Sequence, residues 1–215
     1  MNARTYTPLS IARALLRWLL RLLLVLLLIP VVAYLYFVAT RFLPAKPGLD
    51  AAMAPYQGPA PHLRMLRDIV WADAQGYMRL PSLPSWMNEP DVRLTGYLAR
   101  LISMEGERPR STLQRHLGDL AWQLSLNISY DRESITSLWS AKAFSPAGAG
   151  MEAAALHYFN RPLHELECHD LAALVVMVRA PRRFAPGSAA SEERIRATGL
   201  EAACRQPMTD NAETP

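Results

Sequence analysis

An uncharged, strongly apolar run from Leu22 to Thr40 is the feature that most limits what this chain can fold into. A helix that crosses the hydrocarbon core of a bilayer needs about 20 such residues. Pro30 lies inside the run, and membrane helices tolerate proline better than soluble helices do. The sequence therefore predicts one membrane-spanning helix over residues 22–40, with a folded part attached to it.

The alternative interpretation of this run is a cleavable signal peptide. Such a peptide has a shorter apolar region of about 7–15 residues, followed by a small-residue cleavage site. The run in this chain is longer, and no convincing Ala-x-Ala cleavage pattern follows it, which favours an uncleaved signal anchor. Basic residues are more numerous before the run than just after it. By the positive-inside rule, residues 1–21 are then a cytoplasmic basic segment and the rest is exported.

The net charge of +4 belongs to the anchor and not to the exported part. Residues 1–49 carry six basic side chains and no acidic ones, so the remainder is slightly acidic. A nucleic-acid-binding domain would have a basic surface instead. We therefore expect a membrane partner and no nucleic acid. The expected organisation beyond the span is a linker over 41–61, one folded domain over 62–186, and a polar tail over 187–215 with one short helix.

Apolar residues recur at three- and four-residue spacing through most of the folded part, and no alternating strand pattern interrupts them. Ser111-Thr112-Leu113-Gln114 has the form of a capping box that starts a helix. Asp131 is a second helix-capping residue. The proline-rich segment 80–90, which contains Trp86 and Met87, predicts a loop. These patterns predict an all-α domain.

Two cysteines, Cys168 and Cys204, bear on the redox state of the exported part. An exported location permits a disulfide between them. Cys168, however, falls within an apolar helical pattern, where cysteine often serves as a small buried hydrophobe. On that ground we expect free thiols.

An alanine-rich helical segment with an aromatic and basic end follows Gly150. Its blocks are Glu152-Ala153-Ala154-Ala155, then Tyr158-Phe159-Asn160-Arg161, then an apolar helix and the exit Ala180-Pro181-Arg182-Arg183-Phe184. In this order, residues 146–186 resemble the last third of the family 51 glycosyltransferases, which include the monofunctional biosynthetic peptidoglycan transglycosylases. The resemblance implies a reduced, lysozyme-like helical glycosyltransferase domain behind one N-terminal membrane helix.

A second part of the resemblance is Arg115-His116-Leu117-Gly118-Asp119, which stands where the family has Arg-Lys-x-x-Glu. The family signature grips substrate phosphate and carries the second carboxylate. The resemblance thus implies substrate binding by Arg115 and His116, with His in place of Lys, and a catalytic carboxylate at Asp119, with Asp in place of Glu. A solvated helix face remains the plain alternative. The closing block adds further substrate-binding candidates, for which core packing is the alternative: Glu152, Tyr158 and Arg161.

The first family signature begins with Glu-Asp, and its Glu is the general base that deprotonates the acceptor sugar hydroxyl. The counterpart here is Trp71-Ala72-Asp73, which places Ala72 at the base and leaves Asp73 as a weak catalytic candidate. General-base assistance is worth about 10²–10⁴ in rate. Its loss, with no clear match to the family's donor-site block, predicts impaired catalysis.

Three functions remain as alternatives. The first is a catalytically impaired relative, anchored in the bacterial inner membrane with a periplasmic domain, that serves peptidoglycan biogenesis by binding lipid-linked precursor, glycan or other wall-synthesis proteins. The second is an active transferase that polymerises lipid II with a reorganised site, using Asp73, Glu105 or Asp119 as base. The third is a structural, membrane-tethered protein-interaction module. No zinc-ligand spacing occurs, so we expect no cofactor, although the resemblance by itself allows a divalent metal.

Overall fold

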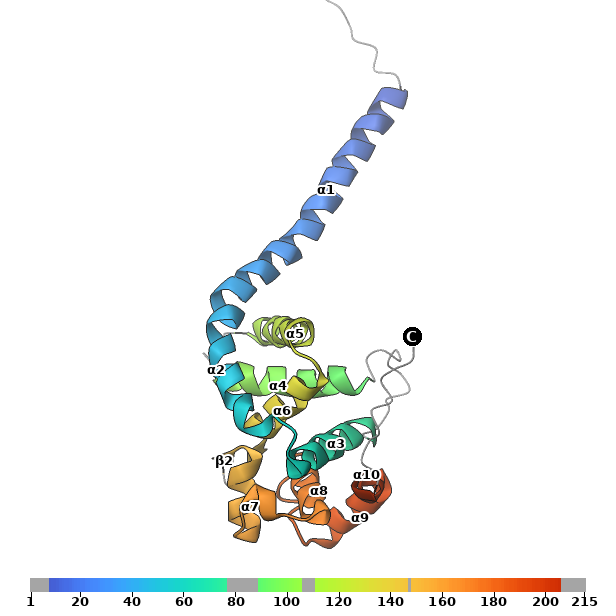
Figure 1. Cartoon of the computed structure of the whole chain (residues 1–215). Helices are drawn as coiled ribbons and strands as arrows, with labels where there is room; N and C mark the ends of the chain where they lie inside the picture. The colour runs from blue at the N-terminus through green and yellow to red at the C-terminus, as the bar shows by residue number, and fades with distance from the viewer. Residues whose placement is uncertain (1–7, 77–88, 106–110, 147, 206–215) are drawn as a thin grey trace, which may run out of the picture. The chain divides into compact units, whose positions relative to one another are not determined.

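The computed structural model shows a helical chain that divides into two compact units, Met1–Ala45 and Lys46–Pro215 (Figure 1). The residues that the structure describes are 8–76, 89–105, 111–146 and 148–205. The segment predicted to be a loop, 80–90, lies mostly outside these residues.

The first unit consists of α1 (Pro8–Phe37) and a short π-helix, η1 (Val38–Phe42). Its most apolar window has a mean hydropathy of 2.8, and none of that window is buried. Pro30 lies inside α1 without ending it. The chain thus has an N-terminal helix long and apolar enough to cross a membrane, as the run from Leu22 to Thr40 predicts.

The segment 41–61, expected to be a linker, is helical over most of its length. It contains α2 (Leu43–Met53) and the 3₁₀ turn η2 (Ala54–Tyr56). Its buried side chains recur at four- and three-residue spacing: Leu49, Met53 and Tyr56. The linker prediction is wrong for this stretch because the packing of one apolar face stabilises a helix despite its Pro and Gly residues.

The second unit is built from helices, with one antiparallel pair of two-residue strands among its described residues. After α2 and η2 the elements are α3 (Pro61–Gly76), α4 (Pro90–Glu105), α5 (Thr112–Ser129), α6 (Arg132–Lys142), β1 (Phe144–Ser145), β2 (Gly148–Ala149), α7 (Met151–Phe159), η4 (Leu163–Glu165), α8 (Cys168–Met177), α9 (Ala189–Thr198) and α10 (Leu200–Arg205). The all-α prediction is confirmed.

The starts of α5 and α6 are set by the capping residues that the sequence indicated. The Ser111 hydroxyl accepts a hydrogen bond from the Gln114 backbone N–H at 3.1 Å. The Asp131 carboxylate accepts one from the Ser134 backbone N–H at 2.8 Å. Each cap satisfies a backbone donor that the first helical turn leaves without a partner.

α8 is the central helix of the second unit. Every side chain from Leu171 to Met177 is at most 2% exposed. Helices α3, α7, α9 and α10 pack against α8, so its continuous apolar run is covered on several sides. The core of the unit therefore lies around α8.

The polar tail expected from residue 187 is folded up to residue 205. It forms α9 and α10 rather than one short helix, and the two are joined at Gly199, whose φ is +67°. Ile195 and Leu200 are at most 1% exposed, and α10 packs against α3 and α8. These two buried residues make the C-terminal helices part of the core.

Cys168, the first residue of α8, is disulfide-bonded. The sequence contains one other cysteine, Cys204. The expectation of free thiols is wrong, because the packing of α10 against α8 returns the end of the chain to the central helix. The helical pattern of the sequence around Cys168 does not indicate this tertiary contact.

Candidate functional site

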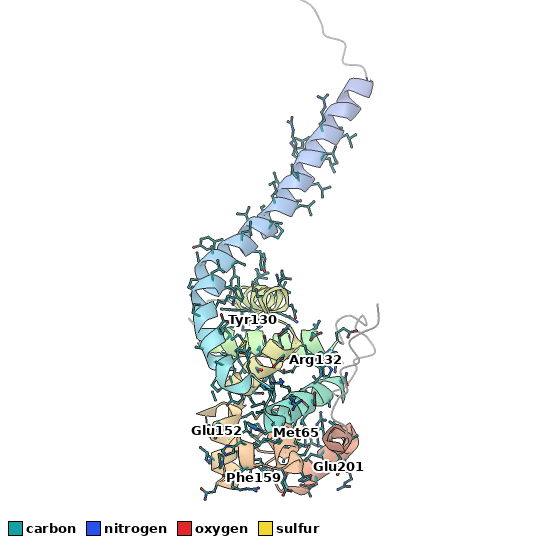
Figure 2. The ribbon with its side chains drawn as sticks, in the orientation of Figure 1. Met65, Tyr130, Arg132, Glu152, Phe159 and Glu201 are labelled. Atoms are coloured by element: carbon teal, nitrogen blue, oxygen red, sulfur yellow. The ribbon has the colours of Figure 1, made fainter. Side chains whose placement is uncertain are left out.

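The candidate residues lie on different helices of the second unit: Asp73 is on α3, Glu105 ends α4, and the others form two separate groups. One group is on α5 and the other is on and just after α7. α5 packs chiefly against α4, whereas α7 packs against α6, α8 and η4. Tyr130, directly after α5, and Glu152, at the start of α7, are well separated in the labelled view (Figure 2). The fold therefore does not combine the two groups into one cluster.

Asp73 lies on α3 and is directed into the interior, with 2% of its surface exposed. Its Oδ2 accepts a hydrogen bond from Arg179 Nε at 2.7 Å and lies 2.6 Å from Arg179 Nη2. A second guanidinium, that of Arg194, lies 3.9 Å from Oδ1. This geometry is that of a charge-assisted ion pair that ties α3 to the end of α8 and to α9. A general base must reach a substrate hydroxyl. The Asp73 carboxylate is instead buried in the ion pair with Arg179.

Ala72, which the sequence resemblance aligns with the family's general base, is half-buried on α3 and carries no group that accepts a proton. Its neighbour Trp71 has the Arg132 guanidinium stacked 3.9 Å from the ring centroid. Burial lowers the pKa of Arg132. Burial also raises the pKa of Asp91, and the positive charge of Arg132 opposes this rise. Asp91 is a carboxyl group that the sequence did not single out. Asp91 lies in the first turn of α4, which is an ordinary position for an aspartate. The sequence therefore does not indicate that Arg132 lies near it.

The group on α5 is the more accessible one. Arg115 and His116 are exposed in the first turns of the helix. Asp119 is half-buried, and its Oδ1 is a buried atom that makes no hydrogen bond with any described residue. An exposed guanidinium offers paired donors that suit phosphate. This group can therefore bind an anion from solvent, with a carboxylate one turn away.

Gly150 explains how the closing block builds the fold. Its φ is +94°, and a Cβ at this position would lie 3.2 Å from both the Ala141 carbonyl oxygen and the Tyr56 hydroxyl oxygen. That hydroxyl accepts a hydrogen bond from the Glu152 backbone N–H at 3.2 Å. A side chain would push these groups apart, so the start of α7 requires glycine. Ala154 and Ala155 behind it are buried.

The substrate-binding candidates of the closing block have contacts within the protein. Both carboxylate oxygens of Glu152 accept hydrogen bonds from the Leu163 backbone N–H, at 3.4 and 3.3 Å. Arg161 pairs with Asp170. Tyr158 is half-buried and lies edge-on to the His157 ring, with 4.7 Å between the centroids. Glu152 and Arg161 thus hold the loop between α7 and α8, and their role toward substrate stays a prediction.

Two further expectations concern Glu105 and a metal ion. The Glu105 carboxylate lies 2.7 Å from Lys142 Nζ, so this alternative base is held in an ion pair. Across the described residues, no group of three or more His, Cys, Asp or Glu side chains is arranged to hold a metal ion. Whether a divalent metal takes part stays a prediction of the resemblance.

Comparison with known proteins adds two findings. The family model described as Transglycosylase matches residues 94–203. The match runs from α4 to α10; it includes Arg115, Asp119 and the closing block, and it leaves out Ala72 and Asp73. Penicillin-binding protein 1A of Aquifex aeolicus (strain VF5) is 29% identical over 94 residues, which cover 43% of this chain and 12% of that protein.

The chain therefore spans a small part of the length of this relative. The family model, in contrast, covers just over half of the chain. The matched region is helical and contains the resemblance at Arg115 and Gly150 that the sequence indicated. This chain belongs to the transglycosylase family, the family 51 glycosyltransferases, and its second unit has the family's lysozyme-like helical fold.

Proposed function

We propose that this protein is a membrane-anchored transglycosylase relative that serves peptidoglycan biogenesis by binding a lipid-linked precursor or glycan, with its own catalysis impaired. One observation carries the proposal. The resemblance puts Ala72 at the position of the general base, and the neighbouring carboxylate, Asp73, is buried in an ion pair with Arg179. Because a general base must reach the acceptor hydroxyl, neither residue can replace the missing Glu.

The proposed location is the inner membrane of a bacterium, with a single pass, a cytoplasmic N-terminus and a periplasmic second unit. The excess of basic residues before the apolar run supports this orientation. The disulfide at Cys168 supports it independently, because disulfides persist in the periplasm and are rare in the cytosol.

The proposed binding group is Arg115 with His116 on α5. Both side chains are exposed, and a guanidinium with an adjacent imidazole suits the phosphate groups of a lipid-linked sugar. His116 and Asp119 stand in place of the Lys and Glu of the family signature, and they keep a nitrogen donor and a carboxylate. Substrate binding can therefore persist although the general base is lost. Wall-synthesis proteins are a second class of partner that the same surface serves.

The test uses the full-length protein in lipid nanodiscs with fluorescent lipid II. We expect saturable binding and no glycan polymer, even at high protein loading. Arg115→Ala should weaken binding about tenfold or more, because a hydrogen bond to a charged group is worth about 1.5–3 kcal/mol. Arg64→Ala, which removes an exposed arginine from α3, is the matched control and should bind normally. Polymer formation would disprove impaired catalysis, and absence of binding would favour a module that binds proteins only.

A second candidate function is an active transferase with a reorganised site. The observation in its favour is Asp119, whose buried Oδ1 makes no hydrogen bond with a described residue. If the wild type forms polymer, Asp119→Asn should abolish it while Asp73→Asn acts through stability. Ala72→Glu asks the converse question, because polymer formed by this variant alone would show that the rest of the site is intact.

A further inference from the structure

Two histidine side chains meet where the first turn of α3 packs against η4. The ring centroids of His62 and His164 are 6.1 Å apart, and the two ring planes are inclined by 59°. His62 is half-buried, whereas 62% of the His164 side chain is exposed. Imidazole is the side chain that acquires a positive charge as the pH falls from about 8 to about 5. Acidification therefore places two positive charges in one contact between α3 and η4.

The pKa of His62 is lower in the folded protein than its ordinary value of 6.5. Burial is the largest cause, because it disfavours the charged ring, and the positive charge of His164 lowers the pKa further. Glu152, at the start of α7, opposes both effects with its negative charge. A further carboxylate, that of Glu165, lies 3.9 Å from His164 Nε2 within η4. The folded state thus favours the neutral form of His62.

This direction makes the contact weaker in acid. The unfolded chain binds a proton at His62 more readily than the folded chain does, so protonation favours the open form. The stability that neutral His62 contributes is present above pH 6.5 and is lost as the pH falls through the lowered pKa. Two unit charges about 6 Å apart in water repel each other strongly enough to change an equilibrium by about threefold.

η4 belongs to the segment that joins α7 to α8, and a weak hydrogen bond helps to hold it. The Leu163 backbone N–H donates to both carboxylate oxygens of Glu152, at 3.4 and 3.3 Å. These distances are long for a hydrogen bond to a carboxylate. Glu152 is also the carboxylate that attracts a charged His62. Protonation of the two rings therefore repels η4 from α3 and gives Glu152 a cationic partner that competes with Leu163.

We propose that the contact of His62 with His164 is an acid-sensitive latch, which holds η4 against α3 near neutral pH and releases it near pH 5. The release is local, because Arg161 still pairs with Asp170 of α8 and α8 itself is buried. The latch gives an exported domain, which the cytosol does not buffer, a structural response to acid. The proposal is independent of whether the domain binds or polymerises a precursor.

The first test measures amide hydrogen exchange of the full-length protein in detergent at about pH 7.5 and about pH 5, corrected for the intrinsic effect of pH on exchange. We expect the protection of the Leu163 amide to be lower by about threefold or more at the acidic pH. His62→Gln should make the protection similar at both pH values. His157→Gln, which removes an exposed histidine from α7, is the matched control and should behave as the wild type does.

Two outcomes overturn the proposal. If the Leu163 amide of the wild type is equally protected at both pH values, acid does not release η4. If the amides of Leu171 to Met177 lose protection together with Leu163, acid destabilises the whole unit and η4 has no latch of its own.

A titration of the imidazole rings by NMR keeps the proposal testable if His62→Gln does not fold. We expect the pKa of His62 to lie below 6.5 in the wild type. His164→Gln should raise it, because this change removes the neighbouring positive charge, and the exposed position of His164 leaves the fold intact. Glu152→Gln should lower it further. If His164→Gln leaves the pKa of His62 unchanged, the two rings do not interact and the latch does not exist.

Discussion

α5 and α8 are both rich in apolar residues, yet the fold uses them in opposite ways. α8 has four helices packed around it, and Leu171 to Met177 are at most 2% exposed. α5 packs chiefly against α4 and leaves five large apolar side chains in solvent. The comparison shows that apolar content alone does not determine the burial of a helix. The neighbouring elements determine whether the protein covers its apolar face.

The same contrast applies to the charged residues that lie on or near these helices. Arg179, just after α8, is committed to the buried carboxylate of Asp73. Arg115, on α5, is exposed to solvent. The α8 half of the domain thus builds the fold, whereas α5 exposes a guanidinium and large apolar side chains to solvent.

The largest expected difference comes from removing one leucine from each helix. Leu174→Ala should destabilise the protein by about 2–5 kcal/mol, because it removes buried methyl groups and leaves a cavity. Leu120→Ala should change the stability by less than about 0.5 kcal/mol in detergent, since its side chain is 61% exposed. Chemical unfolding followed by circular dichroism measures both. Equal losses would mean that the exposed apolar side chains of α5 are part of the core.

The next difference concerns two aspartates. Asp73→Asn should cost about 3 kcal/mol, because it leaves the Arg179 guanidinium without its anionic partner. This is near the low end of the usual range for such pairs, since the Arg179 side chain is 26% exposed. Asp119→Asn on α5 should change stability by about 0.5 kcal/mol or less. A stable Asp73→Asn variant would contradict a structural role for Asp73 and would restore it as a catalytic candidate.

Replacing Gly150 or Gly118 by alanine should change the stability by smaller amounts, with opposite signs. Gly150→Ala should cost about 1–3 kcal/mol, because its backbone conformation disfavours a side chain and the Cβ would crowd Ala141 and Tyr56. Gly118→Ala on α5 should stabilise by about 0.5–1 kcal/mol, since it lies within a helix with open space around it. Melting temperatures of the two variants check the prediction. A stabilising Gly150→Ala would show that the start of α7 adapts easily.

The smallest expected effect is the pH dependence of the link between α2 and the end of α5. The hydrogen bond from Lys46 lowers the pKa of Asp50 below its ordinary value of 3.8. The unfolded chain therefore binds the proton more readily, and the stability from this group is present above pH 3.8 and lost as the pH falls below it. The loss should be slight because both side chains are well exposed. Asp50→Asn should remove this part of the acid dependence, and thermal unfolding across that range measures it.

Local signals in the sequence predicted much of the helical structure. The caps at Ser111 and Asp131 and the three- and four-residue apolar spacing predicted where helices lie. The prediction failed at α2, where Pro and Gly obscured three apolar residues, and it expected one short helix where the largely polar C-terminal segment forms both α9 and α10. At both places packing against the rest of the domain supplies the stability that local propensity lacks.

The candidate site was predictable in its residue types and not in its arrangement. The resemblance selected Asp73, Arg115 and Glu152 as candidates, and their role toward substrate stays a prediction. It could not show that Asp73 pairs with Arg179, which lies 106 residues later in the chain. It also gave no sign of Asp91, whose environment depends on Arg132 and on burial.

The sequence by itself determined the apolar run that is long enough to cross a membrane, the all-α class and the family. Each of these depends on composition, spacing or residue identity along a short stretch. The tertiary structure alone decided that Asp73 is buried, that Cys168 forms a disulfide, and that the apolar stripe of α5 faces outward while that of α8 is covered. These outcomes depend on which distant segments meet, because burial and pairing are properties of neighbours in space.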